Sequence, residues 1–333
     1  MKNFAVSAVA LAGIALFQPQ VACANQLGIA GLYNVFVFGD IVQIGTDVEG
    51  RVAAGGDVTY GANGLGNGFS IASRIPPGSG VPEVVAGNNV NLTNGSVGYL
   101  EPGNTGSPIS QKGAIVYGGS ANIAANVGYG TLSQAVPIDF AKEQSYLTGL
   151  SASWAALNPT GTTSVLRNPN IYEIDLTGSS SKLNIFTVNA NDIVQNIDFK
   201  FFAPEQSTVL VNVFGADVKL MDFAFFFNDA RGDAHTGAYP YSNILFNFAD
   251  ATNIQIDNLE VDGSVLAPFA HIDFAKDSHI EGNVIAMSLS GQGESHDVPF
   301  QGIIPEPATL LLLMVGATGI ALRRRTEQRP VCA

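Results

Sequence analysis

Cysteine is almost absent from this chain of 333 residues. The two cysteines, Cys23 and Cys332, lie one toward each end of the sequence. A disulfide framework is therefore excluded for everything between them, and that part must be held together by its hydrophobic core alone.

Positive charge is scarce as well. Between residues 25 and 305, ten Lys or Arg stand against twenty-six Asp or Glu, which leaves a net charge of −16. Such a domain repels nucleic acid, and it repels anionic polysaccharide unless divalent cations intervene. Charged residues make up only 13% of the chain, and turn-forming and β-branched residues are abundant. This composition excludes nucleic-acid partners and favours an all-β surface protein.

The N-terminus has the pattern of a secretory signal peptide over residues 1–24. Lys2 precedes an apolar run at 4–17, and Ala22 and Ala24 supply the small residues that signal peptidase requires. The mature chain is expected to begin near Asn25. A short N-terminal anchor helix is the alternative, but the run is shorter than the ~20 apolar residues that cross a bilayer.

The C-terminus predicts a short, transient membrane span. Pro305, Glu306 and Pro307 precede fifteen uncharged residues at 308–322, and Arg323, Arg324 and Arg325 follow at once. An apolar segment stopped by arginines is a stop-transfer arrangement with the arginines on the cytoplasmic side. The prolines break any upstream helix and leave an extended stretch that a processing enzyme can reach.

These three parts in this order resemble the PEP-CTERM sorting signal of Gram-negative bacteria. The resemblance implies an exosortase-type processing enzyme, an inner-membrane intermediate, and then a cell-surface or extracellular product. The sorting tail would occupy residues 303–333, of which Thr326–Ala333 has no expected role.

Short apolar strands recur between the two ends, each beginning or ending at a glycine-rich turn. Gly39 and Gly56 are 17 residues apart, whereas Gly87 lies 31 after Gly56 and 32 before Gly119. A repeat near 20 residues predicts a right-handed β-solenoid-like domain over residues 25–302, in which each coil stacks on the previous one. Glycine and asparagine would take the corners with positive φ. An ordinary β-sandwich with regular turns is the alternative fold.

One segment, residues 137–157, predicts a long α-helix beside the strands. Its larger apolar residues fall at spacings of 7, 3, 4 and 3, which places them on one helical face. Pro137 suits the first turn, and Asn158 and Pro159 end the helix. Trp154, the only tryptophan, is interpreted as the core anchor of this helix rather than as a ligand platform.

Phenylalanines cluster in the second half of the chain. The simplest interpretation is an interior stacked ladder, and a sugar-binding platform is the functional alternative. The residues are Phe199, Phe201, Phe202, Phe223, Phe225, Phe226 and Phe227.

Several stretches together resemble the choice-of-anchor A domain of bacterial surface proteins. They are residues 34–40, 49–56, 137–141, 261–268, 293–296 and 299–300. The resemblance implies an extracellular or surface-anchored domain that is adhesive or matrix-associated and has no established chemistry. A helix beside a β-solenoid is also similar to the arrangement in bacterial ice-binding proteins, which is an analogy of fold alone.

The sequence predicts no catalytic set, no metal site and no cofactor. His271 and His279 lie eight residues apart and are interpreted as exposed face residues. Ser295, His296 and Asp297 are adjacent in an extended segment, so neighbouring side chains point to opposite sides and cannot act as a triad. Glu294 and His296 point the same way and are the first pair to test.

Two short motifs carry weaker hypotheses. The glycine-rich stretch at residues 55–64 is faintly similar to calcium-binding repeats, so diffuse Ca²⁺ binding is a hypothesis. Arg231, Gly232 and Asp233 spell a cell-adhesion tripeptide that arises often by chance.

The prediction is a non-enzymatic, exported structural or adhesive protein of the extracellular matrix or biofilm. The alternatives are an exopolysaccharide-binding module and a polysaccharide-modifying enzyme, which would need carboxylates converging within ~5 to 10 Å.

Overall fold

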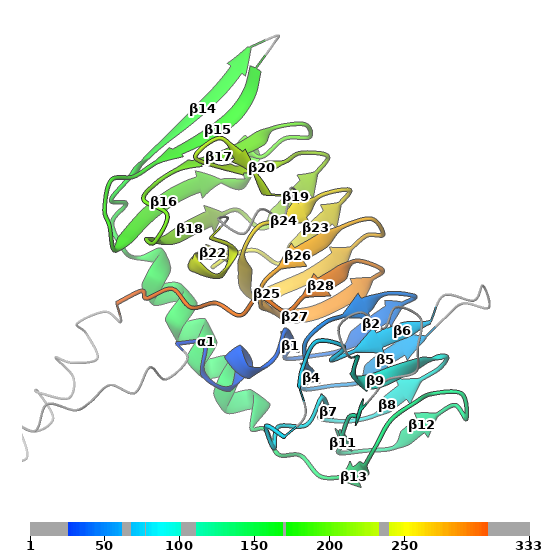
Figure 1. Cartoon of the computed structure of the whole chain (residues 1–333). Helices are drawn as coiled ribbons and strands as arrows, with labels where there is room; N and C mark the ends of the chain where they lie inside the picture. The colour runs from blue at the N-terminus through cyan, green and yellow to red at the C-terminus, as the bar shows by residue number, and fades with distance from the viewer. Residues whose placement is uncertain are drawn as a thin grey trace, which may run out of the picture.

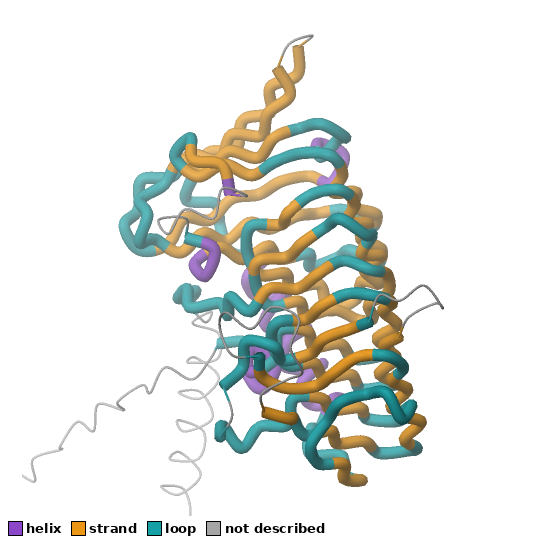
Figure 2. The backbone as a smooth tube through the Cα atoms, turned by 45° about the vertical axis from the view of Figure 1, so that its right-hand side comes forward, coloured by secondary structure: helices purple, strands orange, loops and turns teal. Residues whose placement is uncertain are grey.

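The fold is a tall stack of short parallel strands with one helix along its side. The computed structural model describes residues 26–61, 68–76, 78–100, 111–168, 171–232 and 240–305. Figure 1 shows the strands as successive rungs, with α1 (Phe140–Ala155) running along one side of the stack. Figure 2 shows the same rungs turned by 45°, with loops at the corners where the chain changes face.

The largest sheet has 16 strands and forms two of the faces. One face packs against α1, and we call it the helix face. In stacking order it contains β16 (Leu183–Asn189), β18 (Thr208–Phe214), β22 (Ile244–Asn247), the first part of β25 (Ser264–Phe274), the first part of β27 (Val284–Gly291), β1 (Val35–Val37), β4 (Val52–Ala54), β7 (Val84–Ala86), β11 (Ile115–Tyr117) and β13 (Leu132–Gln134). The second face contains β19 (Asp217–Met221), β23 (Asn253–Asp257), the ends of β25 and β27, β2 (Ile41–Ile44), β5 (Val58–Gly61), β8 (Val90–Leu92) and β12 (Ala121–Ile123).

Two smaller sheets complete the coils. The seven-stranded sheet contains, in order, β24 (Glu260–Val261), β26 (His279–Glu281), β28 (Glu294–His296), β3 (Asp47–Val48), β6 (Phe69–Ile71), β9 (Gly95–Tyr99) and β10 (Gln111–Lys112). The five-stranded sheet contains β14 (Thr162–Asn168), β15 (Ile171–Thr177), β17 (Asp198–Phe202), β20 (Phe225–Phe227) and β21 (Ala230–Arg231). The described strands of the 16-stranded sheet pair in parallel. The alternative fold, a sandwich of face-to-face antiparallel sheets, is therefore wrong.

The order of stacking is not the order of the sequence. The first coil starts in the middle of the stack, and later coils run to one end as far as β13. Helix α1 then leads back along the side, and β14–β16 resume at the opposite end (Figure 1). The last coil returns to the middle, where β27 pairs with β1 in parallel. The expectation that each coil stacks on the previous one is therefore wrong at this seam.

The helix is stabilised by a buried apolar face and by a polar cap at its N-terminus. It begins three residues later than Pro137, at Phe140, because the Asp139 side chain accepts a hydrogen bond from the Lys142 amide at 3.0 Å and acts as N-cap. Leu147, Leu150 and Trp154 are buried between the helix and the helix face, as the spacing predicted.

The interior of the stack is a ladder of apolar side chains. Five of the seven clustered phenylalanines are buried and in ring contact with neighbouring rungs. Phe202 and Phe226 are the half-exposed exceptions, and Lys200 lies 5.7 Å above the Phe226 ring. An interior ladder is thus confirmed for most of the cluster.

The positive φ expected at the corners is adopted by glycines such as Gly263 and Gly291 and by asparagines such as Asn258, but the glycines at three of the turns have another role. Gly55, Gly87 and Gly118 do not adopt positive φ, whereas several corner Asn and Asp residues do. A Cβ on Gly87 would lie 2.2 Å from the Gly55 carbonyl oxygen, so glycine is required by close stacking of the rungs.

The Asp and Asn residues of these turns form a hydrogen-bonded ladder along the stack. Asp40 accepts from the Asp57 amide at 2.7 Å, and Asp57 accepts from the Asn89 amide at 3.0 Å. Asn89 accepts in turn from Ser120. The repeated turn motif therefore ties neighbouring coils together.

Candidate functional site

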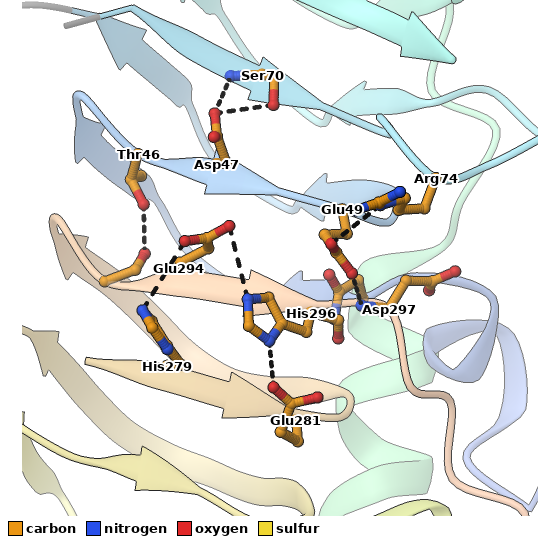
Figure 3. A network of polar contacts seen from close by, with 12 residues as sticks. Thr46, Asp47, Glu49, Ser70, Arg74, His279, Glu281, Glu294, His296 and Asp297 are labelled. Carbon is orange, nitrogen blue, oxygen red and sulfur yellow. Dashed lines mark hydrogen bonds and ion pairs between the residues drawn. The ribbon is translucent and has the colours of Figure 1, made fainter. Parts of the chain in front are cut away.

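A group of ionisable side chains gathers where the last coil meets the first. Strand β28 pairs with β26 on one side and β3 on the other, so residues about 250 positions apart become neighbours. Because alternate residues of a strand face outward, the outward positions of these three strands form one surface. We call it the charged face, and it comprises Asp47, Glu49, His279, Glu281, Glu294 and His296 (Figure 3).

His296 lies at the centre of the charged face. Its Nδ1 contacts a Glu281 carboxylate oxygen, and its Nε2 lies 3.6 Å from Glu294 Oε1. The Glu281 side chain is only 5% exposed, whereas the Glu294 side chain is 36% exposed. The ring thus joins an inner carboxylate to an outer one, and only the outer one is open to a ligand.

His279 extends the group toward a hollow in the surface. Its ring centroid lies 5.1 Å from that of His296, and its Nε2 lies 3.9 Å from Glu294 Oε2. The hollow has a volume of about 360 Å³. Its walls combine apolar and polar side chains, namely Phe223, Phe225, Leu259, Asn258, Arg231, Glu260, Asp262, Asp277 and His279.

The other edge of the charged face is tied down by hydrogen bonds. Asp47 Oδ1 accepts from the Ser70 amide at 2.9 Å and from its hydroxyl at 2.8 Å. Glu49 accepts from Arg74 Nε and from the Asp297 amide, both at 3.2 Å. These carboxylates are therefore held in fixed positions along the seam.

The surroundings of His296 favour its charged form. Burial opposes protonation of the ring, but hydrogen bonds to Glu281 and Glu294 outweigh it and raise the His296 pKa to about 10. The same hydrogen bond from His296 lowers the pKa of Glu294. Burial raises the pKa of Asp47 despite its bonds to Ser70.

Stability should therefore fall in alkaline solution. A histidine whose folded pKa lies above its unfolded value of ~6.5 stabilises the fold fully below that pH. The contribution is lost as pH rises toward 10, the folded pKa. Urea unfolding of the domain between pH 6.5 and 10 should show this decline, on the order of a few kcal/mol at most.

The matched control for this decline is His296→Gln, which cannot gain the charge. Its unfolding free energy should vary less with pH over the same window than that of the original protein. Parallel pH profiles for the two proteins would contradict the assignment.

The structure sorts the residues that the sequence singled out. Ser295 points inward and is fully buried, whereas His296 and Asp297 are half-buried, so Ser295 and His296 lie on opposite sides of the strand. His271 lies on the second face, where it contacts the Ser288 and Ser290 hydroxyls, away from His279. Within the described ranges, no group of three or more His, Cys, Asp or Glu residues could hold a metal ion.

Glu49, Asp47 and Glu281 are site residues that the sequence did not single out. They lie in or next to short strands that carry no distinguishing motif, and Asp47 and Glu49 come beside Glu281 only where the two ends of the described chain stack on each other. The outward alternation within each strand was the one available signal.

The sorting and signal residues lie mostly outside the described residues. This holds for Ala22, Ala24, Glu306, Pro307, Arg323, Arg324 and Arg325, and for the predicted span at 308–322. Pro305 is described and exposed. A search of the described part of the chain finds no helix with the length and hydropathy needed to cross a membrane.

Comparison with protein families decides what kind of domain this is. A family described as "Putative Ice-binding-like adhesive domain" matches residues 26–297, most of the chain. The chain belongs to this family. A PEP-CTERM protein-sorting motif matches residues 304–325, which confirms the predicted sorting signal and indicates export to the cell surface or the medium. The choice-of-anchor A resemblance stays a hypothesis, because the matching family is a different one.

Solved structures with a similar arrangement are distant. An ice-binding protein from the Antarctic ascomycete Antarctomyces psychrotrophicus is 11% identical, with 82% of this chain and 97% of that chain covered and a TM-score of 0.35. A glycosylated ice-binding protein from Arctic yeast is 12% identical, with 85% of this chain and 98% of that chain covered and a TM-score of 0.36. An ice-binding protein domain from Shewanella frigidimarina is 11% identical, with 81% of this chain and 95% of that chain covered and a TM-score of 0.30. No curated protein matches the chain.

Proposed function

We propose that this protein is an exported, non-enzymatic adhesin of the extracellular matrix or biofilm, and that the charged face with its adjoining hollow is its adhesive surface. The observation that carries the proposal is an adhesive-domain family match over residues 26–297, followed directly by a sorting motif. Export then places the domain outside the cell, where the charged face contacts the matrix.

The chemistry of this surface suits a hydroxyl-rich ligand such as an exopolysaccharide. Carboxylates and imidazoles bind hydroxyl groups, and Phe223 and Phe225 supply apolar wall to the hollow. Its volume of about 360 Å³ lies at the small end of the range for ligand sites, ~300–1,000 Å³. A net charge of −16 favours a neutral polymer over an anionic one.

The absence of enzymatic activity is part of the proposal. A glycosidase needs one carboxyl with a raised pKa to act as general acid. Asp47 is exposed and has a raised pKa, but its Oδ1 is bound by the Ser70 amide and hydroxyl. Glu294 is the carboxylate beside His296 and His279, and its hydrogen bond from His296 lowers its pKa. It therefore stays ionised near neutral pH and can accept hydrogen bonds but cannot donate a proton.

Two further features belong to the proposal. The parallel coils wind as a right-handed β-solenoid, the hand that connections between parallel strands take in nearly all proteins. The chain divides into a signal peptide at 1–24, a domain at 25–302 and a sorting tail at 303–333.

Neutralising two charges on the adhesive surface should weaken adhesion roughly 30-fold, because each lost hydrogen bond to a charged group contributes ~1 kcal/mol or more. The variant is Asp47→Asn with Glu294→Gln, and the measurement is binding of the purified domain to immobilised neutral exopolysaccharide.

The matched control neutralises two carboxylates on the second face, with Asp217→Asn and Asp273→Asn. Both of these residues are exposed. The control should bind like the unchanged domain. Equal loss in the two variants would show that overall charge, rather than the charged face, governs adhesion. Growth of ice crystals with the same proteins separates adhesion to polymer from adhesion to ice.

A further inference from the structure

The segment that directly precedes the Pro305–Pro307 triplet is bound to the domain by a series of backbone hydrogen bonds. Phe300, Gln301, Ile303 and Ile304 each donate their backbone amide to the domain, at 2.8 Å in every case. The acceptors are Asn283, Ser242, Thr208 and Gln26. Residues 300–304 therefore form a strap, which extends past 302, the expected end of the domain.

The side chains of the strap reinforce this attachment. Phe300 and Ile304 are buried in the apolar cluster between α1 and the helix face, together with Trp154 and Leu147. A Cβ at Gly302 would lie 2.5 Å from the Phe300 ring. Phe300, Gly302 and Ile304 are thus packed inward, Gln301 and Ile303 face solvent, and the exposed Pro305 follows the strap.

The Gln26 side chain pairs with the backbone of Ile304 through two hydrogen bonds, as a neighbouring β-strand would. Its Nε2 donates to the Ile304 carbonyl at 2.7 Å, and its Oε1 accepts from the Ile304 amide at 2.8 Å. Its own carbonyl accepts from the Tyr146 hydroxyl of α1 at 2.9 Å. The two ends of the described chain therefore lie side by side along α1 (Figure 1).

The two clamped residues adjoin the two predicted processing sites. Cleavage after Ala24 would leave Gln26 as the second residue of the mature chain. Ile304 directly precedes the Pro305–Pro307 triplet. We propose that the folded domain sets the N-terminal limit of C-terminal processing: Gln26 holds Ile304, so the sorting enzyme can cut only on the C-terminal side of Ile304.

The proposal also brings the domain close to the membrane before processing. Three residues, Pro305 to Pro307, separate the strap from the predicted span at 308–322. A fully extended chain covers ~3.3–3.6 Å per residue, so this spacer reaches about 10 Å. A membrane-embedded enzyme then meets this spacer directly after the strap, which is bound to the domain.

Limited proteolysis tests this clamp, the pair of hydrogen bonds between Gln26 and Ile304. The sample is the protein without its signal peptide but with its C-terminal tail, purified in detergent micelles. Thermolysin cuts ahead of large apolar residues, and the strap offers Phe300, Ile303 and Ile304. The unchanged protein should give a resistant core that ends at Pro305 or later. Gln26→Ala removes two hydrogen bonds and should speed cleavage at Ile303 and Ile304 roughly 10- to 30-fold.

Gln301→Ala is the matched control, because the Gln301 side chain is exposed and its backbone amide still reaches Ser242. It should digest like the unchanged protein. Thr208→Val keeps the shape of that side chain but removes the acceptor for Ile303, so it should also speed cleavage in the strap. The site of each cut, read by mass spectrometry, separates local opening from general unfolding.

Two results would overturn the clamp. One is a resistant core of the unchanged protein that ends before Ile304, and the other is a Gln26→Ala digest that matches the Gln301→Ala digest. Mature protein recovered from cells with an exosortase-type enzyme should likewise retain Ile304. Adhesion is measured on a separate surface, so failure here leaves the proposed function untouched.

Discussion

Replacing Trp154 with alanine is expected to lower the free energy of unfolding by about 3–5 kcal/mol. The Trp154 side chain is fully buried against the coils that the helix covers, beside Leu210, Leu245 and Leu266. Its indole nitrogen has no hydrogen-bond partner within the described part of the protein. The loss is therefore one of packing, because the change removes a large ring and leaves a cavity.

The backbone bond at this position should survive the change. The Trp154 carbonyl accepts from Asn212 at 2.9 Å, and alanine keeps that acceptor. Ser151 one turn earlier donates to Asn247 at 2.6 Å, so the helix stays pinned to two rungs. We expect a folded but weakened domain whose urea midpoint falls while the slope of the transition changes little.

Phe269→Ala provides the comparison, because this aromatic residue of β25 is 45% exposed. Its replacement should cost a small fraction of the Trp154 effect. Similar losses for the two variants would mean that the helix does not anchor the stack.

Gly87→Ala is the second large effect and should cost about 2–3 kcal/mol or prevent folding. A Cβ at this position would lie 2.2 Å from the Gly55 oxygen and 2.8 Å from the Gly55 carbonyl carbon. Both are backbone atoms of the neighbouring rung, so no side chain can move aside. Two rungs would have to separate, which breaks the hydrogen bond from the Gly87 amide to Ala54 at 2.7 Å.

Gly149→Ala makes the same chemical change where there is room. Nothing lies within 4 Å of a Cβ at this position in α1. Alanine should raise the unfolding free energy by about 0.5–1 kcal/mol, because glycine costs that much inside a helix. Thermal unfolding of both variants should show opposite signs, and a shared sign would contradict the steric argument.

The glycine result shows where a local interpretation fails. Glycines at regular intervals predicted repeated turns, and the turns are present. Positive φ was the expected reason, and it holds at Gly263 and Gly291, whereas Gly55 and Gly87 do not adopt it. The need for glycine comes from the rung above or below, and a single stretch of sequence does not contain that neighbour.

Local patterns were sufficient for the elements themselves. The helical spacing around Trp154, the short strands between turns and most of the interior phenylalanine ladder follow from periodicity within one stretch of chain. The sorting motif could also be read directly, because its three parts are contiguous. In each case the decisive residues lie close together in sequence.

Only the tertiary structure decided how distant segments meet. The last coil stacks on the first, and that single pairing of β27 and β28 with β1 and β3 creates the charged face around His296. The same return of the chain places Ile304 against Gln26, 278 residues away. The physical reason is that parallel rungs pair through backbone groups common to all residues. The sequence alone therefore determined that rungs, a helix and a sorting tail would form, while packing along the helix and closure of the stack decided which rungs and which charges became neighbours.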